Sequence, residues 1–169
     1  MKRALLLFAI ALLMCISVAA QQSRRAQRSS QGQNGLSESY SRWLSEDVVY
    51  IITPEEKRAF LMLKSNEERE QFIEQFWRRR DTNPATSENE YRTEYYARIA
   101  YANENFAFGD TQGWRTDRGR TYITLGKPDV VQKSSSGEVW IYNNAPFGRG
   151  YVRQEFVDRD GTGNLRVQP

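Results

Sequence analysis

The chain has 169 residues, with 24 lysines and arginines against 21 acidic residues, no histidine and one cysteine. The absence of histidine excludes Ser-His-Asp and Cys-His nucleophilic systems and the common zinc sites, as these are usually built. The near balance of charge gives no reason to expect a nucleic-acid partner.

The first twenty residues have the order of a cleavable secretory signal. A basic start at Lys2 and Arg3 precedes an apolar stretch, and small residues lie just before Gln21. The apolar stretch is shorter than the roughly 20 residues that a transmembrane helix needs. We therefore expect residues 1–20 to be removed on export, leaving a periplasmic or extracellular protein that is not transmembrane.

The cysteine, Cys15, lies inside this signal segment. A lipoprotein attachment site has a small residue before its cysteine, and Met14 is not small. Cleavage after Ala20 would leave a chain with no thiol, hence no disulfide and no cysteine nucleophile.

Residues 21–39 are rich in glutamine, serine, glycine and arginine and contain few apolar side chains. Such a composition cannot offset the entropy lost on ordering, which predicts a disordered basic tether. Its arginines (Arg24, Arg25 and Arg28) predict at most weak contact with an anionic surface.

Helical patterns dominate the chain from Tyr40 to about Phe106. An apolar stripe at helical spacing begins at Trp43. The segments 53–56 and 65–68 both have the residue pattern of a capping box, which marks the start of a helix. A longer helix is expected to start after Thr86 or Ser87. The arginine run 78–80 suits the last turn of a helix, where cations favour the helix dipole.

After Gly109 the apolar period changes to two. The pattern predicts strands at 120–125, 138–142, 151–157 and 165–167, joined as antiparallel hairpins by turn residues. Helices followed by strands indicate an α+β fold. We expect one domain over residues 40–169, with about four N-terminal helices packed on a small C-terminal antiparallel sheet.

The pentapeptide 113–117, with the sequence Gly-Trp-Arg-Thr-Asp, carries a family resemblance. Together with matching blocks such as 67–69, 72–77 and 98–103, it resembles the GWxTD-domain family of exported bacterial proteins over about 43–142. The resemblance implies export and names no reaction. The chain departs from the family at Thr82 and Tyr95, where relatives tend to have aspartate-proline and a histidine, so no histidine role transfers.

Carboxylates offer one route to catalysis. Glu90 and Glu94 lie one turn apart on the long helix, and with Asp117 they could form a paired-carboxylate site for hydrolysis of a glycan. Glu94 and Arg98 are also spaced as an ordinary stabilising ion pair.

The segment 113–120 has two interpretations. In the structural one, Trp114 fills the helix layer, Thr116 and Asp117 accept hydrogen bonds from loop N–H groups, and Arg118 or Arg120 pairs with Asp117 or Asp81. In the functional one, Arg115, Arg118 and Arg120 present a surface for an anion or a partner.

We expect no metal or cofactor. Residues 158–164 partly follow a calcium loop, but the position that needs a glutamate is Pro169. The preferred function is an exported, non-catalytic interaction module of the bacterial cell envelope, with a protein partner. Its predicted binding residues are Trp114, Arg115, Asp117, Arg118 and Arg120. The alternative is a carboxylate-based hydrolase acting on an envelope polymer.

Overall fold

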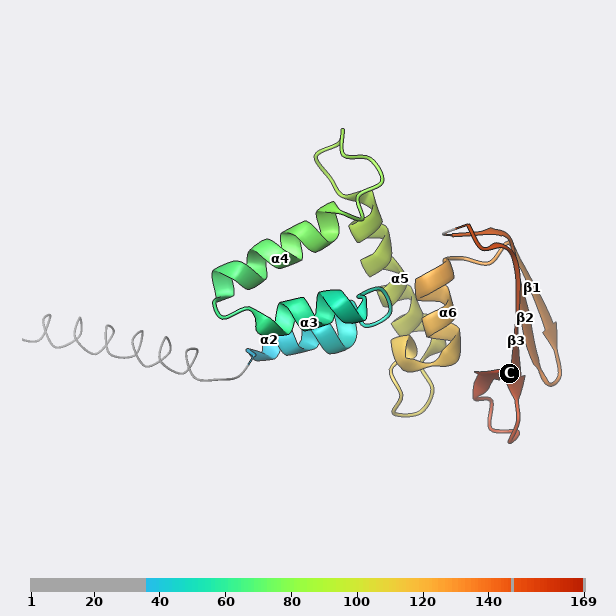
Figure 1. Cartoon of the computed structure of the whole chain (residues 1–169). Coiled ribbons are helices and arrows are strands. Elements are labelled where there is room, and N and C mark those ends of the chain that lie inside the picture. The colour runs from blue at the N-terminus through green and yellow to red at the C-terminus, as the bar shows by residue number, and fades with distance from the viewer. Residues whose placement is uncertain (1–35, 147, 169) are drawn as a thin grey trace, which may run out of the picture. The chain divides into compact units, whose positions relative to one another are not determined.

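The structure is a computed structural model that describes residues 36–146 and 148–168 (Figure 1). The chain divides into two units, Met1–Trp43 and Leu44–Pro169. The predicted signal, residues 1–20, and the predicted tether up to residue 35 lie outside the described residues. No helix within the described ranges has the length and apolar character needed to cross a bilayer.

The first described helix is α2 (Glu38–Arg42), which begins inside the segment predicted as a tether. Arg42 donates a hydrogen bond to the Glu38 carboxylate at 3.1 Å, one turn earlier. A π-helical turn, η1 (Trp43–Asp47), follows α2. The predicted apolar stripe that begins at Trp43 therefore does not continue as one α-helix.

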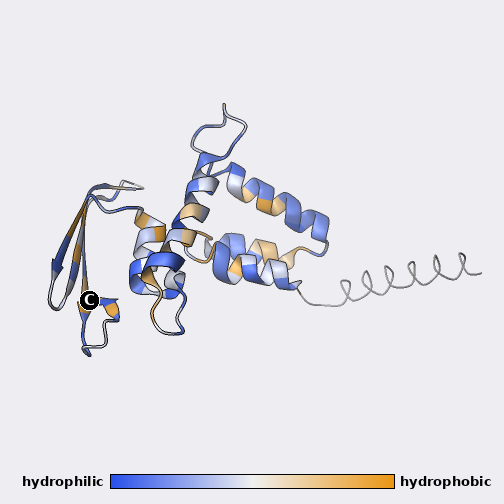
Figure 2. Cartoon of the chain, turned by 180° about the vertical axis from the view of Figure 1, so that it is seen from behind, coloured by the Kyte–Doolittle hydropathy of each residue, from blue (hydrophilic) through white to orange (hydrophobic). Residues whose placement is uncertain are grey.

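Two capped helices begin the second unit, α3 (Pro54–Met62) and α4 (Asn66–Arg78). Both predicted capping boxes are confirmed. Thr53 and Ser65 accept from the backbone N–H three residues later, and the carboxylates of Glu56 and Glu68 accept from the cap N–H groups. Figure 2 shows hydrophilic residues and a smaller number of hydrophobic ones on both helices, as expected for one buried face.

The longest helix is α5 (Glu90–Phe106), which is capped by Asn89. A short 3-10 turn, η2 (Gly113–Arg115), leads from it to α6 (Asp117–Leu125). The predicted strand at 120–125 is therefore wrong. Helix α6 is covered by α5, η2 and a C-terminal strand, and as a result every second residue from Gly119 to Leu125 is buried. Burial of every second residue is also the pattern of a half-buried strand.

Four antiparallel strands follow the helices, in the order β1-β2-β3-β4. They are β1 (Val130–Ser134), β2 (Gly137–Ala145), β3 (Gly150–Asp158) and β4 (Leu165–Val167). The last three contain the strands predicted at 138–142, 151–157 and 165–167, whereas β1 was not predicted. Helices first and an antiparallel sheet second confirm the predicted α+β class, with five α-helices in the described part of the chain.

Aromatic side chains fill two regions of the second unit. In the helical region, Trp77 of α4 packs against Tyr95 and Tyr96 of α5, with ring centres 5.7 and 5.5 Å apart. Beside the sheet, Trp140 of β2 lies 5.4 Å from the ring of Phe106 and 4.8 Å from that of Phe156. Burial of such rings contributes on the order of 2–3 kcal/mol each.

A partly buried ion-pair cluster joins the start of α3 to the end of α4. Arg80 donates to both carboxylate oxygens of Glu56, at 2.7 and 3.0 Å, and Arg79 donates to the same carboxylate at 3.0 Å. The Arg80 guanidinium also lies 3.6 Å from the ring centre of Phe76. Burial raises the pKa of Glu56, but hydrogen bonds from Arg80, the Thr53 backbone and Arg79 outweigh it and lower the pKa to about 2.

Candidate functional site

The Gly-Trp-Arg-Thr-Asp segment forms a tight corner between α5 and α6. A Cβ atom at Gly113 would clash with the carbonyl oxygen of Ala102 on α5, and one at Gly119 would clash with the carbonyl oxygen of Gly113. The Asn103 side chain accepts a hydrogen bond from the Trp114 backbone N–H at 3.0 Å. The corner therefore depends on two glycines that let the backbone segments approach closely.

Side-chain hydrogen bonds hold the corner together. Thr116 donates to the Gly113 carbonyl at 2.8 Å and accepts from the Gly119 N–H at 3.1 Å. Trp114 is buried, and its carbonyl accepts from the Tyr50 hydroxyl at 2.9 Å. Burial raises the pKa of Tyr50, against the opposing effect of Arg120 and Arg115.

Asp117 connects the corner to the sheet. Its Oδ2 accepts a hydrogen bond from the Val167 N–H of β4 at 2.8 Å, and its Oδ1 lies 3.6 Å from the Arg120 guanidinium. The residue begins α6, where a negative charge favours the helix dipole. Asp117 thus positions β4 against α6.

The three arginines of the corner have different surroundings. The Arg115 guanidinium lies 4.6 Å from the ring centre of Trp114 and 3.6 Å from Glu46. Arg118 lies 5.2 Å from the ring centre of Phe106 and 3.6 Å from Glu138, and its side chain is only 18% exposed. Arg118 therefore packs against α5 and the sheet, whereas Arg115 and Arg120 are each 54% exposed.

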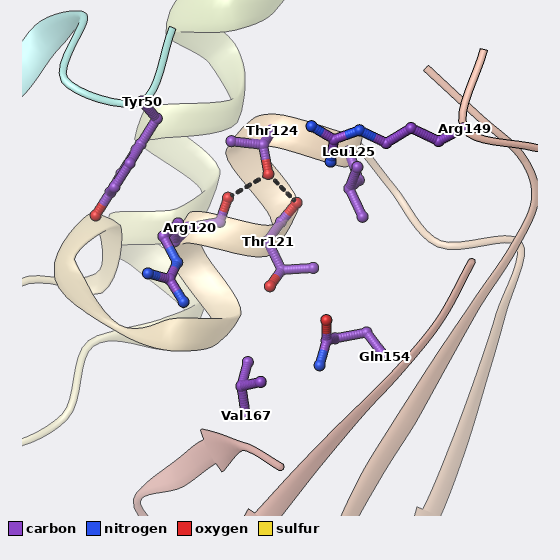
Figure 3. A pocket seen from close by; sticks show the side chains of 8 residues that line it. All are labelled: Tyr50, Arg120, Thr121, Thr124, Leu125, Arg149, Gln154 and Val167. Atoms are coloured by element: carbon purple, nitrogen blue, oxygen red, sulfur yellow. Dashed lines mark hydrogen bonds between the residues drawn. The ribbon is translucent and has the colours of Figure 1, made fainter. Parts of the chain in front are cut away.

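A cavity of about 290 Å³ lies beside the corner, between α6 and β3 (Figure 3). Its lining residues are Tyr50, Arg120, Thr121, Thr124, Leu125, Arg149, Gln154 and Val167. Among them are two arginines and no acidic side chain. Within the described part of the chain, no carboxylate forms an ion pair with Arg149.

The polar groups of the cavity differ in what they can still bind. Thr124 donates to the backbone carbonyls of Arg120 and Thr121, at 2.8 and 3.2 Å (Figure 3), so its proton is already used. Arg120 keeps donors beyond its long contact with Asp117, since one guanidinium carries five N–H groups. Figure 3 shows the Gln154 amide reaching toward the space below α6. The cavity is therefore suited to an anionic group that accepts hydrogen bonds.

The three carboxylates considered for hydrolysis lie in different environments. Glu90 accepts from the Thr86 hydroxyl at 2.6 Å, and this bond lowers its pKa. Glu94 accepts from Arg98 at 2.9 Å, one turn later on α5. Asp117 bonds the β4 backbone. None of the three lines the cavity beside the corner, and the hydrolase alternative stays a prediction.

Sequence reasoning found Arg120 but missed the residues that complete its cavity. Tyr50 precedes α3, and Arg149 and Gln154 belong to the second hairpin of the sheet. These segments are distant in sequence, and only their packing around α6 brings them together. The positions of Arg149 and Gln154 in the sequence do not by themselves indicate a binding site.

A family model described as the GWxTD domain matches residues 27–162. Comparison with curated proteins and with solved structures gave no match.

Proposed function

The chain belongs to the GWxTD domain family, and we propose that it is a non-catalytic interaction module of the bacterial cell envelope. The module binds an anionic group of a protein partner in the cavity beside the corner. Its role is recognition, with no bond made or broken.

The cavity is the observation that carries this proposal. Arg120 and Arg149 supply two cations to a lining that has no acidic side chain. A guanidinium forms paired, charge-assisted hydrogen bonds with carboxylate or phosphate, and these are stronger than neutral ones. An aspartate or glutamate side chain, or a chain terminus, of the partner would supply such a group.

Export is the second part of the proposal, and it rests on the N-terminal segment. The basic start, apolar run and small residues before Gln21 support a cleaved signal and a periplasmic or extracellular location. Fractionation of cells that express the full chain tests this. A processed protein in the periplasm or medium is expected, and an unprocessed protein in the cytoplasm would contradict it.

Partner capture with two matched variants tests the cavity. Arg115 and Arg120 belong to the same corner, are equally exposed, and each lies 3.6 Å from one carboxylate, but only Arg120 lines the cavity. We expect Arg120→Glu to lose a partner that the parent captures by crosslinking in envelope fractions, and Arg115→Glu to retain it.

The folded state of both variants is checked by circular dichroism and melting temperature. Equal capture by the parent and a folded Arg120→Glu variant would refute the cavity as the binding site. Loss of capture by Arg115→Glu alone would move the site to the Trp114 side of the corner.

A further inference from the structure

The outer edge of β1 is open. β1 ends the strand order, and within the described ranges only β2 pairs with it. All five of its residues are exposed, including Val130 at 44% and Val131 at 42%. Native edge strands are usually protected by prolines, bulges, charges or a covering element, and here Lys133 is the only charged residue. The edge is therefore free to accept another strand.

One face of β1 borders a groove. Val131 pairs with Trp140 and Lys133 pairs with Glu138 across the β1–β2 ladder, and all four line a cavity of about 320 Å³ between the sheet and the α5–α6 pair. Val130 does not line it, as expected for the opposite face of the strand. The groove thus meets alternate residues of β1.

Aromatic rings form the helical wall of this groove. Tyr101 of α5 stacks on Tyr122 of α6 with ring centres 4.5 Å apart. Tyr101 is 43% exposed, so this wall of the groove can be reached from solvent. An apolar or aromatic side chain that enters the groove would bury its surface against these rings.

The charge of the groove selects its occupant. Arg118, Lys127 and Lys133 line it, and Glu138 is the only acid in the lining. The Glu138 carboxylate is largely buried, accepts a hydrogen bond from the Trp140 indole N–H at 2.9 Å, and lies within 3.7 Å of both Arg118 and Lys133. The charge of Glu138 is offset by these two cations, and with three basic side chains against one acid the groove as a whole is cationic.

We propose that β1 is a docking edge for an extended, acidic segment of a partner protein. The segment adds as a fifth strand, its alternate apolar side chains enter the groove over Tyr101 and Tyr122, and its carboxylates approach Lys127 and Lys133. Addition of a strand supplies backbone hydrogen bonds for affinity, and the groove supplies side-chain selectivity. A second copy fits less well, because it would bring one cationic groove against another.

This surface is separate from the cavity of Arg120 and Arg149, and no residue lines both. The two proposals can therefore fail independently. Arg120→Glu should leave binding at the β1 edge unchanged.

The test begins with selection of displayed random twelve-residue peptides on the full chain. Enrichment of peptides that alternate apolar and acidic residues is expected. A synthetic copy of the most enriched peptide is then titrated by fluorescence anisotropy, where Lys133→Glu should weaken binding at least tenfold. Raising the salt concentration from 50 to 300 mM should weaken it as well, because the contributing charges are exposed.

Two neighbouring valines provide a matched pair of variants. Val130 and Val131 are almost equally exposed and lie on opposite faces of β1. Val131→Asp should weaken peptide binding at least tenfold, whereas Val130→Asp should weaken it about threefold or less. Slower amide hydrogen exchange along β1 in the complex would locate the added strand.

Several results would overturn the proposal. These are enrichment of basic peptides or of none, equal effects of the two valine variants, and dimerisation of the free chain through β1. Tight binding of polygalacturonate, used as an acidic glycan probe, with no effect of Val131→Asp would also reject a peptide occupant.

Discussion

Two arginine clusters in the described part of the chain look alike in sequence and differ in their structural surroundings. Arg79 and Arg80, at the end of α4, converge on the one carboxylate of Glu56 at distances of 2.7 to 3.0 Å. Arg115, Arg118 and Arg120 at the corner approach three different carboxylates, each at 3.6 Å.

This difference separates arginines whose donors are used within the fold from arginines that can still bind a ligand. The α4 cluster satisfies its donors within the fold, including the backbone carbonyls of Ile51 and Phe76. The corner is held instead by glycine contacts and by hydrogen bonds of Thr116 and Asp117, which leaves Arg120 with unused donors. Density of arginine in a sequence is therefore a weaker guide to a binding site than the number of partners each one has.

Substitution of Gly119 by alanine should have the largest effect. The added Cβ would clash with the Gly113 carbonyl oxygen, and backbone atoms have little room to move. We expect a loss of about 3 kcal/mol in the free energy of unfolding. Urea denaturation measures it, with Gly148→Ala as the control. Gly148 has open space around its Cβ position but a φ of +69°, so the control should lose only about 1 kcal/mol from backbone strain. Equal losses would show that the close approach does not hold the corner.

Loss of Arg80 from the cluster at the end of α4 should have the next largest effect on stability. Arg80→Ala leaves the partly buried Glu56 carboxylate with one arginine and exposes the ring of Phe76. The expected loss is about 2 kcal/mol by urea denaturation. Arg120→Ala should cost below about 0.5 kcal/mol, since that ion pair is long and exposed. Similar losses from both variants would remove the distinction between the two clusters.

Acid should weaken the same cluster selectively. The folded pKa of Glu56 is lowered from 4.5 to about 2, so its contribution to stability is present above pH 4.5 and is lost as the pH falls toward 2. The melting temperature of the parent should fall over this range. Glu56→Gln should start lower and show a shallower fall, and parallel curves for the two proteins would contradict the assignment.

The smallest effect is expected at Glu94. Glu94→Gln removes an exposed ion pair with Arg98 and should change the free energy of unfolding by less than about 0.5 kcal/mol. The same variant tests the hydrolase alternative, since assays on cell-wall material would lose activity if this carboxylate were catalytic. Activity of the parent that disappears in this stable variant would overturn the non-catalytic proposal.

Local signals in the sequence predicted local structure well. The capping boxes at Thr53 and Ser65 involve contacts three residues apart, so their residue types alone indicate helix starts. The helix α6 was mistaken for a strand because its burial depends on elements distant in sequence. β1 was missed because its sequence, Val-Val-Gln-Lys-Ser, has no apolar alternation and both its faces are exposed.

The site was predictable only in part, for the same reason. Arg120 was recognised from its place near the family pentapeptide, whereas Tyr50, Arg149 and Gln154 reach the cavity through long-range packing. The pairing of Arg79 and Arg80 with Glu56 joins residues more than twenty positions apart. Nothing in the arginine run itself distinguishes this pairing from a favourable interaction with the helix dipole.

The hydrogen bond between Asp117 and Val167 has a consequence for folding kinetics. It links positions fifty residues apart, and Val167 also lines the cavity, so the cavity closes only when β4 docks on α6. Contacts of such sequence separation form late, because the intervening loop must first be closed. β4 is also only three residues long, and short edge elements open locally far more often than the whole domain unfolds. Transient release of β4 would therefore remove the Val167 side of the cavity, and so weaken ligand binding there, without unfolding of the whole domain.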